Sequence, residues 1–199
     1  MSIKDGREYR SLQNFSLVPR EEGSEEGSEE YRVKGTAVVF NTPTVMFESD
    51  GIKYYEVIDR HAFDECDLSD VIFNYNHGGK VVARLRNKTL ELTITERGLD
   101  MGADLSGTQA GRELYEEIDG GYIDKMSFSF SVREAKYDSQ THTRTITKVK
   151  KLYDVSAVDI PAYNKTSISA RSFFSEEHEK EVKALEQARR RKKLIALTY

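Results

Sequence analysis

Residues 123–132 of the chain read IDKMSFSFSV, a run in which apolar and serine side chains alternate. Because successive side chains of a β-strand point to opposite faces, this alternation predicts a strand with one apolar and one polar face. The apolar face is expected to lie in the core and consists of Met126, Phe128, Phe130 and Val132. The polar face consists of Ser127, Ser129 and Ser131. The alternation alone does not distinguish a plain polar face from one that contains a nucleophile.

The sequence on either side of this run predicts a mainly β domain with one internal helix. Apolar and β-branched runs predict strands at residues 31–41, 53–59, 70–77, 80–86, 89–105 and 145–161. The run at 89–105 is long enough for two strands around a turn at Arg97-Gly98, and Gly78-Gly79 is interpreted as a hairpin turn. Residues 108–122 place Leu114, Tyr115 and Ile118 at helical spacing before Gly120-Gly121, which predicts an amphipathic helix.

The distribution of charge divides the chain into three parts. Residues 1–30 contain a candidate first strand at 9–19 and the acidic repeat EEGSEEGSEE, which predicts a flexible linker because nothing in it can be buried. Residues 31–170 are predicted to form the folded domain. Residues 171–199 predict a charged helical tail, acidic at its start and basic at its end, which suits the helix dipole. The apolar residues of this tail are sparse, so we expect it to be exposed or docked to a partner.

Composition excludes several classes of protein. The 199 residues carry a net charge of -4, without the basic footprint of a nucleic-acid-binding protein, although residues 189–193 read RRRKK. Cys66 is the only cysteine, so we expect no internal disulfide and a reducing compartment. The first residues lack the apolar region of a secretory signal, and no apolar run approaches the roughly 20 residues that span a bilayer. We therefore expect a soluble protein without a membrane or nucleic-acid partner.

Metal and cofactor motifs are not found in the sequence. The four histidines are not paired at helical spacing, and neither a cysteine cluster nor a glycine-rich phosphate loop is present. We therefore expect no metal and no cofactor. Cys66, five residues after His61, is interpreted as a small buried apolar residue rather than as a thiol nucleophile.

Nucleophilic serine chemistry is the remaining candidate. A serine hydroxyl becomes a useful nucleophile when a base accepts its proton and a third group orients that base. The chain offers the serines of residues 123–132, His77 at the end of a predicted strand, and Asp154 in a late strand. It contains no GxSxG elbow, so an α/β-hydrolase is not indicated. Many β proteins contain these three residue types, so spacing alone does not select among them.

Seven segments, in order along the chain, resemble the tailed-phage prohead (capsid maturation) serine proteases. They are KGTAVVFN, YYEVIDRHAFDE, FNYNHGG, VARL, LELTITERGLDMGADL, GRELYEEIDGGYIDKMSFSFSV and LYDVSAVDIPAYN, and the resemblance covers about residues 31–164. The most specific elements are an Asn-His after a strand, a glycine-ended helix before a Met-Ser-Phe strand, and a closing Val-Ser…Pro-Ala segment. The resemblance implies an assemblin-like β-barrel (mainly β, α+β) with peripheral helices, here followed by the C-terminal helical tail.

The resemblance also implies a function. It implies a serine endopeptidase that cleaves scaffold segments or scaffold proteins inside the bacteriophage prohead, in the host cell cytoplasm, during capsid maturation. The substrate would be the major capsid protein, the scaffold protein or both, and we also consider a homo-oligomer. The alternative interpretation is a non-enzymatic β-barrel module, either structural or binding, of the capsid or scaffold.

The resemblance also implies which residues of this sequence have the catalytic roles of the family. The base falls on His77, the nucleophile on Ser127 and the orienting acid on Asp154, with His142 and Asp159 as alternatives to Asp154. The other two serines of the polar face are then structural neighbours, and replacing either by alanine is expected to keep the chemistry. Two positions depart from the family pattern, because Gly78 stands where an acidic residue is common and Ser129 where glycine is frequent.

Overall fold

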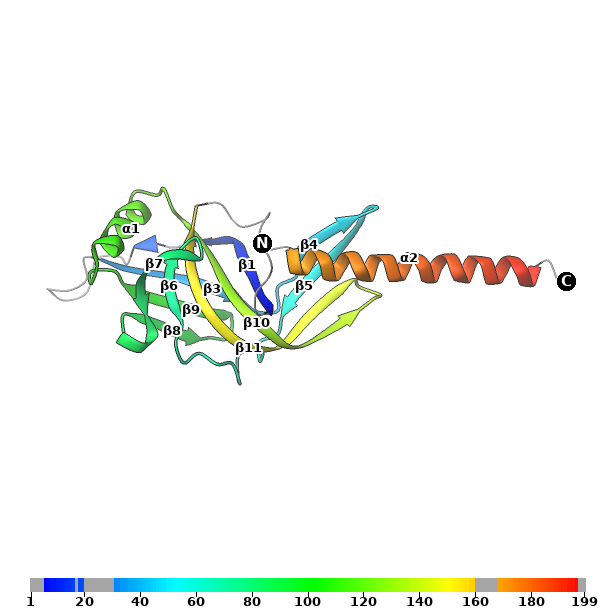
Figure 1. Ribbon diagram of the computed structural model, residues 1–199, viewed down its shortest axis with the longest axis horizontal. Helices are drawn as coiled ribbons and strands as arrows, with labels where there is room; N and C mark the ends of the chain where they lie inside the picture. The colour runs from blue at the N-terminus through cyan, green and yellow to red at the C-terminus, as the bar shows by residue number, and fades with distance from the viewer. Residues whose placement is uncertain (1–5, 17, 20–30, 160–167, 197–199) are drawn as a thin grey trace.

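The structure is a computed structural model that describes residues 6–16, 18–19, 31–159 and 168–196 (Figure 1). The larger of its two sheets has the strand order β1 (Arg7–Ser16), β10 (Lys125–Asp138), β11 (Thr143–Val158), β5 (Ile52–Ile58) and β4 (Thr44–Ser49). Two further strands belong to this sheet, β6 (Ile72–Tyr75), which pairs with β11, and β7 (Gly78–Arg84), which pairs with β6. The smaller sheet has the order β2 (Val18–Pro19), β3 (Arg32–Val39), β9 (Gly98–Asp104) and β8 (Leu90–Ile94).

The described chain is mainly β, as the sequence predicts, with an internal helix and a C-terminal helix. The closed barrel implied by the resemblance is not found among the described strands. Among the described strands, the larger sheet ends in open edges at β1, β4 and β7, and the smaller sheet ends in open edges at β2 and β8. The two sheets contribute to one hydrophobic core.

The long β10–β11 hairpin organises the larger sheet. β11 runs parallel to two different strands, pairing with β5 through its first residues and with β6 through Asp154–Ala157. On the other side of the hairpin, β1 pairs with β10, where Ser11 lies opposite Ser127. The strands β1, β10, β11 and β6 therefore lie side by side in the region that carries the serines (Figure 1).

The alternation in residues 123–132 correctly predicts the apolar face of β10. Met126, Phe128 and Phe130 are fully buried in the core, and Val132 packs against it. Ser127 and Ser129 are also fully buried, so both faces of the strand are covered. A buried serine needs a hydrogen-bond partner, because an unpaired buried hydroxyl is costly.

The turn between β6 and β7 differs from the predicted one. Tyr75 pairs with Gly78, so Asn76 and His77 form a two-residue loop, and Gly78-Gly79 belong to β7. Asn76 and His77 have φ values of 51° and 56°, and a type I′ turn requires positive φ at both central positions. Asparagine and histidine enter this region more readily than most residues, a signal that the prediction missed by favouring the glycine pair.

Strand β4 was not predicted from the sequence. It pairs with β5 across a two-residue loop in which Asp50 and Gly51 have φ values of 52° and 76°. An Asp-Gly pair between β-prone runs is a strong hairpin signal and could have identified this strand.

Helix α1 (Gln109–Asp119) confirms the predicted internal helix. Its N-terminus is capped by Thr108, whose hydroxyl accepts a hydrogen bond of 2.9 Å from the backbone N–H of Gly111. Leu114 and Ile118 are buried on the face that the spacing predicts, and Gly120 is the C-cap residue.

Helix α2 (Ile168–Ala196) contains the predicted tail helix but begins earlier, at Ile168. Its first turns bury Ala170 and Phe174 against Tyr54 of β5, and residues 182–195 are exposed. Figure 1 shows the helix running away from the sheets toward the C-terminus. The acidic repeat at residues 21–30 lies outside the described residues. Neither helix of the described chain is both long and apolar enough to cross a membrane.

Candidate active site

The register of three neighbouring strands brings polar side chains together. In the antiparallel β10–β11 pair, Ser127 lies opposite Ser156 and Ser129 lies opposite Asp154. In the parallel β11–β6 pair, Ser156 lies beside Asn74. Side chains on directly opposite residues have Cβ atoms only about 4.5–5.5 Å apart, so polar groups on one face can bond across the strands.

The turn after β6 brings a histidine to the same place. The backbone N–H of Asn76 donates a 2.9 Å hydrogen bond to the carbonyl of Ala157, which ties the turn to β11. The ring of Tyr9 from β1 lies edge-on to the ring of His77, with centroids 4.8 Å apart. The left-handed backbone at His77 costs on the order of 1–3 kcal/mol, so it persists only where surrounding contacts stabilise it. The hydrogen bond from Asn76 and the ring contact with Tyr9 provide this stabilisation.

The structure places the three predicted site residues in contact with one another. His77 Nε2 lies 2.6 Å from Ser127 Oγ, and His77 Nδ1 lies 2.6 Å from Asp154 Oδ1. The exposed fraction of the side chain is 12% for His77 and 7% for Asp154, and Ser127 is fully buried. The contacts therefore run from a hydroxyl through an imidazole to a carboxylate.

The contacts fix the direction of the hydrogen bonds. An ionised carboxylate can only accept, so Asp154 requires the hydrogen of a neutral His77 on Nδ1. Nε2 is then free to accept the Ser127 hydroxyl hydrogen. The arrangement can remove a proton from the serine oxygen, which is what nucleophilic serine chemistry requires.

Asp154 also accepts hydrogen bonds from two serines. Ser129 Oγ donates to Oδ2, and Ser156 Oγ lies 2.9 Å from Oδ1 but has one hydrogen to share between this oxygen and the side-chain oxygen of Asn74. Ser156 additionally contacts the Asn74 side-chain oxygen and lies 3.1 Å from His77 Nδ1. Asn74 and Ser156 were not predicted from the sequence, although alternation along β11 puts Ser156 on the face of Asp154.

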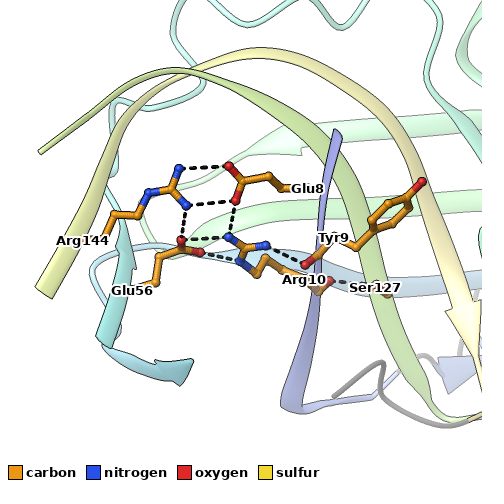
Figure 2. Close-up of polar contacts among 6 residues, drawn as sticks. All are labelled: Glu8, Tyr9, Arg10, Glu56, Ser127 and Arg144. Carbon is orange, nitrogen blue, oxygen red and sulfur yellow. Dashed lines mark hydrogen bonds and ion pairs between the residues drawn. The ribbon is translucent and has the colours of Figure 1, made fainter. Parts of the chain in front are cut away.

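Strand β1 contacts the site from the other side of β10. The backbone carbonyl of Arg10 accepts a hydrogen bond of 2.9 Å from Ser127 Oγ (Figure 2). The Ser127 hydroxyl has one hydrogen and two acceptors, His77 Nε2 and this carbonyl. It therefore donates to one of them at a time.

A buried cluster of four charges anchors β1 to the sheet. Figure 2 shows the four side chains, Glu8 and Arg10 of β1, Glu56 of β5 and Arg144 of β11. Arg10 bonds both oxygens of Glu56, at 2.5 and 2.8 Å, and Arg144 bonds both oxygens of Glu8 at 2.9 Å. Burial raises the pKa of Glu8, but the bond from Arg144 and the charges of both arginines outweigh it and lower that pKa. The two positive and two negative charges balance within the cluster.

Replacing Arg144 by methionine is expected to lower the free energy of unfolding by about 3–5 kcal/mol, because one side of a buried ionic cluster is left uncompensated. Urea unfolding measures this loss. The matched control is Arg133→Met, which removes an ion pair of 3.2 Å with Glu65 in which both side chains are largely exposed. The control is expected to cause a much smaller loss, since exposed pairs contribute little. Equal losses in the two variants would contradict the anchoring role of the cluster.

The two alternatives to Asp154 have other partners. His142 Nδ1 lies 3.2 Å from Glu181 of helix α2, and its ring lies 5.0 Å from the ring of Tyr54. Asp159 accepts a hydrogen bond of 2.9 Å from the Tyr75 hydroxyl. The contact with His77 Nδ1 is made by Asp154.

The other candidate residues lie elsewhere in the fold. Cys66 packs against the core, and burial raises the pKa of its thiol to about 11, which leaves little thiolate at neutral pH. His61 Nδ1 lies 2.9 Å from Asp64 at the surface. Within the described residues, no group of three or more His, Cys, Asp or Glu side chains is placed to hold a metal ion.

Comparison with known proteins gives one match. The model of a family described as the caudovirus prohead serine protease matches residues 18–181. The matched range includes His77, Ser127 and Asp154, whereas β1 precedes it. No curated protein and no solved structure matches the chain.

Proposed function

Since the chain belongs to the caudovirus prohead serine protease family, we propose that it is a serine endopeptidase with Ser127 as nucleophile, His77 as base and Asp154 as orienting acid. One observation carries the choice of residues. Both ring nitrogens of His77 make contacts of 2.6 Å, one with Ser127 Oγ and the other with Asp154 Oδ1. This is the arrangement that a base needs to accept the proton of a serine while a carboxylate holds its tautomer.

The proposed reaction has two halves. His77 Nε2 accepts the proton as Ser127 Oγ attacks the scissile carbonyl carbon, and it returns that proton to the departing amine when the C–N bond breaks. The acyl group is then bound to Ser127 as an ester. Water attacks the ester with His77 again acting as base, and the carboxylic acid product leaves as the serine recovers its hydrogen. Asp154 accepts the Nδ1 hydrogen throughout and stabilises the imidazolium.

The proposed substrates are scaffold segments or scaffold proteins, including those joined to the major capsid protein, inside the immature capsid in the host cell. Family membership supports a peptidase role in capsid maturation at this level. We also propose the relation of the fold to herpesvirus assemblin, which an experimental structure compared with assemblin would test.

The proposed domain division keeps residues 31–170 as the protease domain and residues 171–199 as a docking tail, with one amendment. β1 is proposed to work with the protease domain, because it pairs with β10 and its Arg10 carbonyl contacts Ser127. Exposure of residues 182–195 of α2 supports the proposed docking of the tail to scaffold or capsid protein.

Co-expression with the capsid and scaffold proteins of the same phage tests the function. With the wild-type chain we expect the intact mass of one of these proteins to fall by a defined segment. With Ser127→Ala we expect the full-length mass, and with Ser131→Ala the cleaved mass. Full-length masses in every sample, with the proteins assembled, would favour the non-enzymatic capsid or scaffold module instead.

A further inference from the structure

We propose that Ser129 is a positioning residue, which fixes the Asp154 carboxylate so that Oδ1 faces His77, with Ser156 assisting. This inference rests on the proposed function and deepens it. Within the described part of the chain, the groups that donate to Asp154 are His77, Ser129 and Ser156. Two of these three groups are hydroxyls, and Ser129 is the one that bonds Oδ2, whereas the hydrogen of Ser156 is shared between Oδ1 and the Asn74 side-chain oxygen.

Burial makes these two hydroxyl groups important. Ser129 and Ser156 are fully buried, and Asp154 is buried with them. An ionised carboxylate loses its water on burial and needs hydrogen bonds from the protein to stay ionised. A carboxylate bonded at one oxygen can still rotate, whereas donors on both oxygens fix its plane.

The two serines act on different oxygens of the carboxylate. Ser129 Oγ donates to Oδ2, the oxygen that points away from the histidine. Ser156 Oγ shares Oδ1 with His77 Nδ1. Loss of the Ser129 hydroxyl leaves Oδ2 without its donor, so the carboxylate can turn and its bond to His77 weakens.

The strand provides its own matched control. Ser129 and Ser131 are two residues apart on the same face of β10, and both are buried. Ser129 lies opposite Asp154, whereas Ser131 lies opposite Lys151 and its hydroxyl lies 3.5 Å from the Tyr153 hydroxyl. Replacing either by alanine removes one buried hydroxyl, but only one of the replacements affects the carboxylate directly.

The consequence is kinetic and is measurable without the natural substrate. A fluorophosphonate probe reacts with an activated serine and gives a maximal rate, kinact, and an apparent affinity, KI. Ser129→Ala keeps the nucleophile and the base, as expected from the sequence. Because it removes the donor to Oδ2, we nevertheless expect it to lower kinact by roughly 10- to 100-fold with KI unchanged, the size of a lost hydrogen bond to a charged group. Ser131→Ala is expected to leave both constants within about threefold, because the partner of its hydroxyl within the described residues is the neutral Tyr153 hydroxyl. Thermal unfolding confirms that each variant is folded, and Ser129→Cys, which keeps a side chain of similar size but has only a weak S–H donor, replaces Ser129→Ala if that variant does not fold.

A double-mutant cycle separates positioning from general destabilisation. If Ser129 acts through Asp154, adding Ser129→Ala to Asp154→Asn is expected to cost little more, because the group that it positions has already been lost. A purely structural defect would lower the rate by the same factor in both backgrounds.

The hydrogen on His77 Nδ1 gives a readout that needs no reaction. Proton NMR of the wild-type protein is expected to show a far-downfield imidazole resonance that is lost in Asp154→Asn. We expect this resonance to move in Ser129→Ala and to stay in place in Ser131→Ala. This readout decides the question even if the probe reacts slowly with the isolated protein.

The two proposals fail in different ways. Probe labelling or substrate cleavage that survives Ser127→Ala would overturn the proposed function. Labelling that requires Ser127 but is equally fast in Ser129→Ala and Ser131→Ala, with the His77 resonance unchanged in both, would overturn the role of Ser129 alone.

Discussion

Replacing Ser127 by alanine is expected to lower the rate of substrate cleavage by roughly 10⁴- to 10⁶-fold, the range seen when the nucleophile of a triad is lost. The chemical reason is that the Ser127 hydroxyl makes the 2.6 Å contact with His77 Nε2, and alanine removes that hydroxyl. Loss of one oxygen atom from a small side chain costs at most about 1–3 kcal/mol even where the side chain is buried, so the replacement is not expected to unfold the domain. The measurement is the rate of cleavage of purified, assembled capsid substrate, with circular dichroism to confirm the fold.

The cleavage rate of Ser127→Ala is compared with the rates of the wild type and of Ser131→Ala, which changes a serine of the same strand. A rate for Ser127→Ala within a few-fold of the wild type would remove Ser127 from the mechanism. A collapse of activity in Ser131→Ala, with Ser127→Ala active, would move the nucleophile along the strand.

Replacing Asp154 by asparagine is expected to lower the cleavage rate by about 10⁴-fold, as for the orienting acid of other serine triads. An asparagine amide can donate a hydrogen bond toward Nδ1, which favours the tautomer with the hydrogen on Nε2. That tautomer cannot accept the Ser127 proton, so the base is lost although the geometry is kept. The rate of cleavage at saturating substrate measures the effect.

Two control variants examine the alternatives to Asp154. Asp159→Asn changes an acid that bonds Tyr75, and His142→Gln changes a histidine that faces Glu181. Both are expected to retain activity within a few-fold. A severe loss in either one, with an active Asp154→Asn, would transfer the orienting role to that residue.

The sequence predicts the faces of the strands but not the order in which they pair. Alternation correctly places Phe128 and Phe130 in the core. It cannot predict that β11 pairs first with β5 and then with β6, because this division depends on contacts between distant segments. The contact of Ser129 with Asp154 follows from the register of the β10–β11 pair, which alternation along one strand does not contain, so alternation treats the three serines of β10 as equivalent.

The position of His77, the proposed base, could also be predicted only in part from the sequence. The sequence indicates a turn near Gly78-Gly79, whereas the structure puts His77 inside the turn with positive φ. A histidine in the loop projects from a fixed backbone, held by the bond from Asn76 to Ala157. The role of β1 was beyond prediction for a related reason, since its link to Ser127 is a backbone carbonyl and backbone groups leave no signal in the sequence.

The most direct test of the central claim is to map the covalent adduct of a fluorophosphonate probe on the protein in assembled proheads. Peptide mass spectrometry is expected to find the adduct on Ser127 in the wild type and to find no adduct in His77→Ala, because the serine then lacks its base. An adduct on a different serine, or unlabelled Ser127 in proheads where cleavage is under way, would contradict the account.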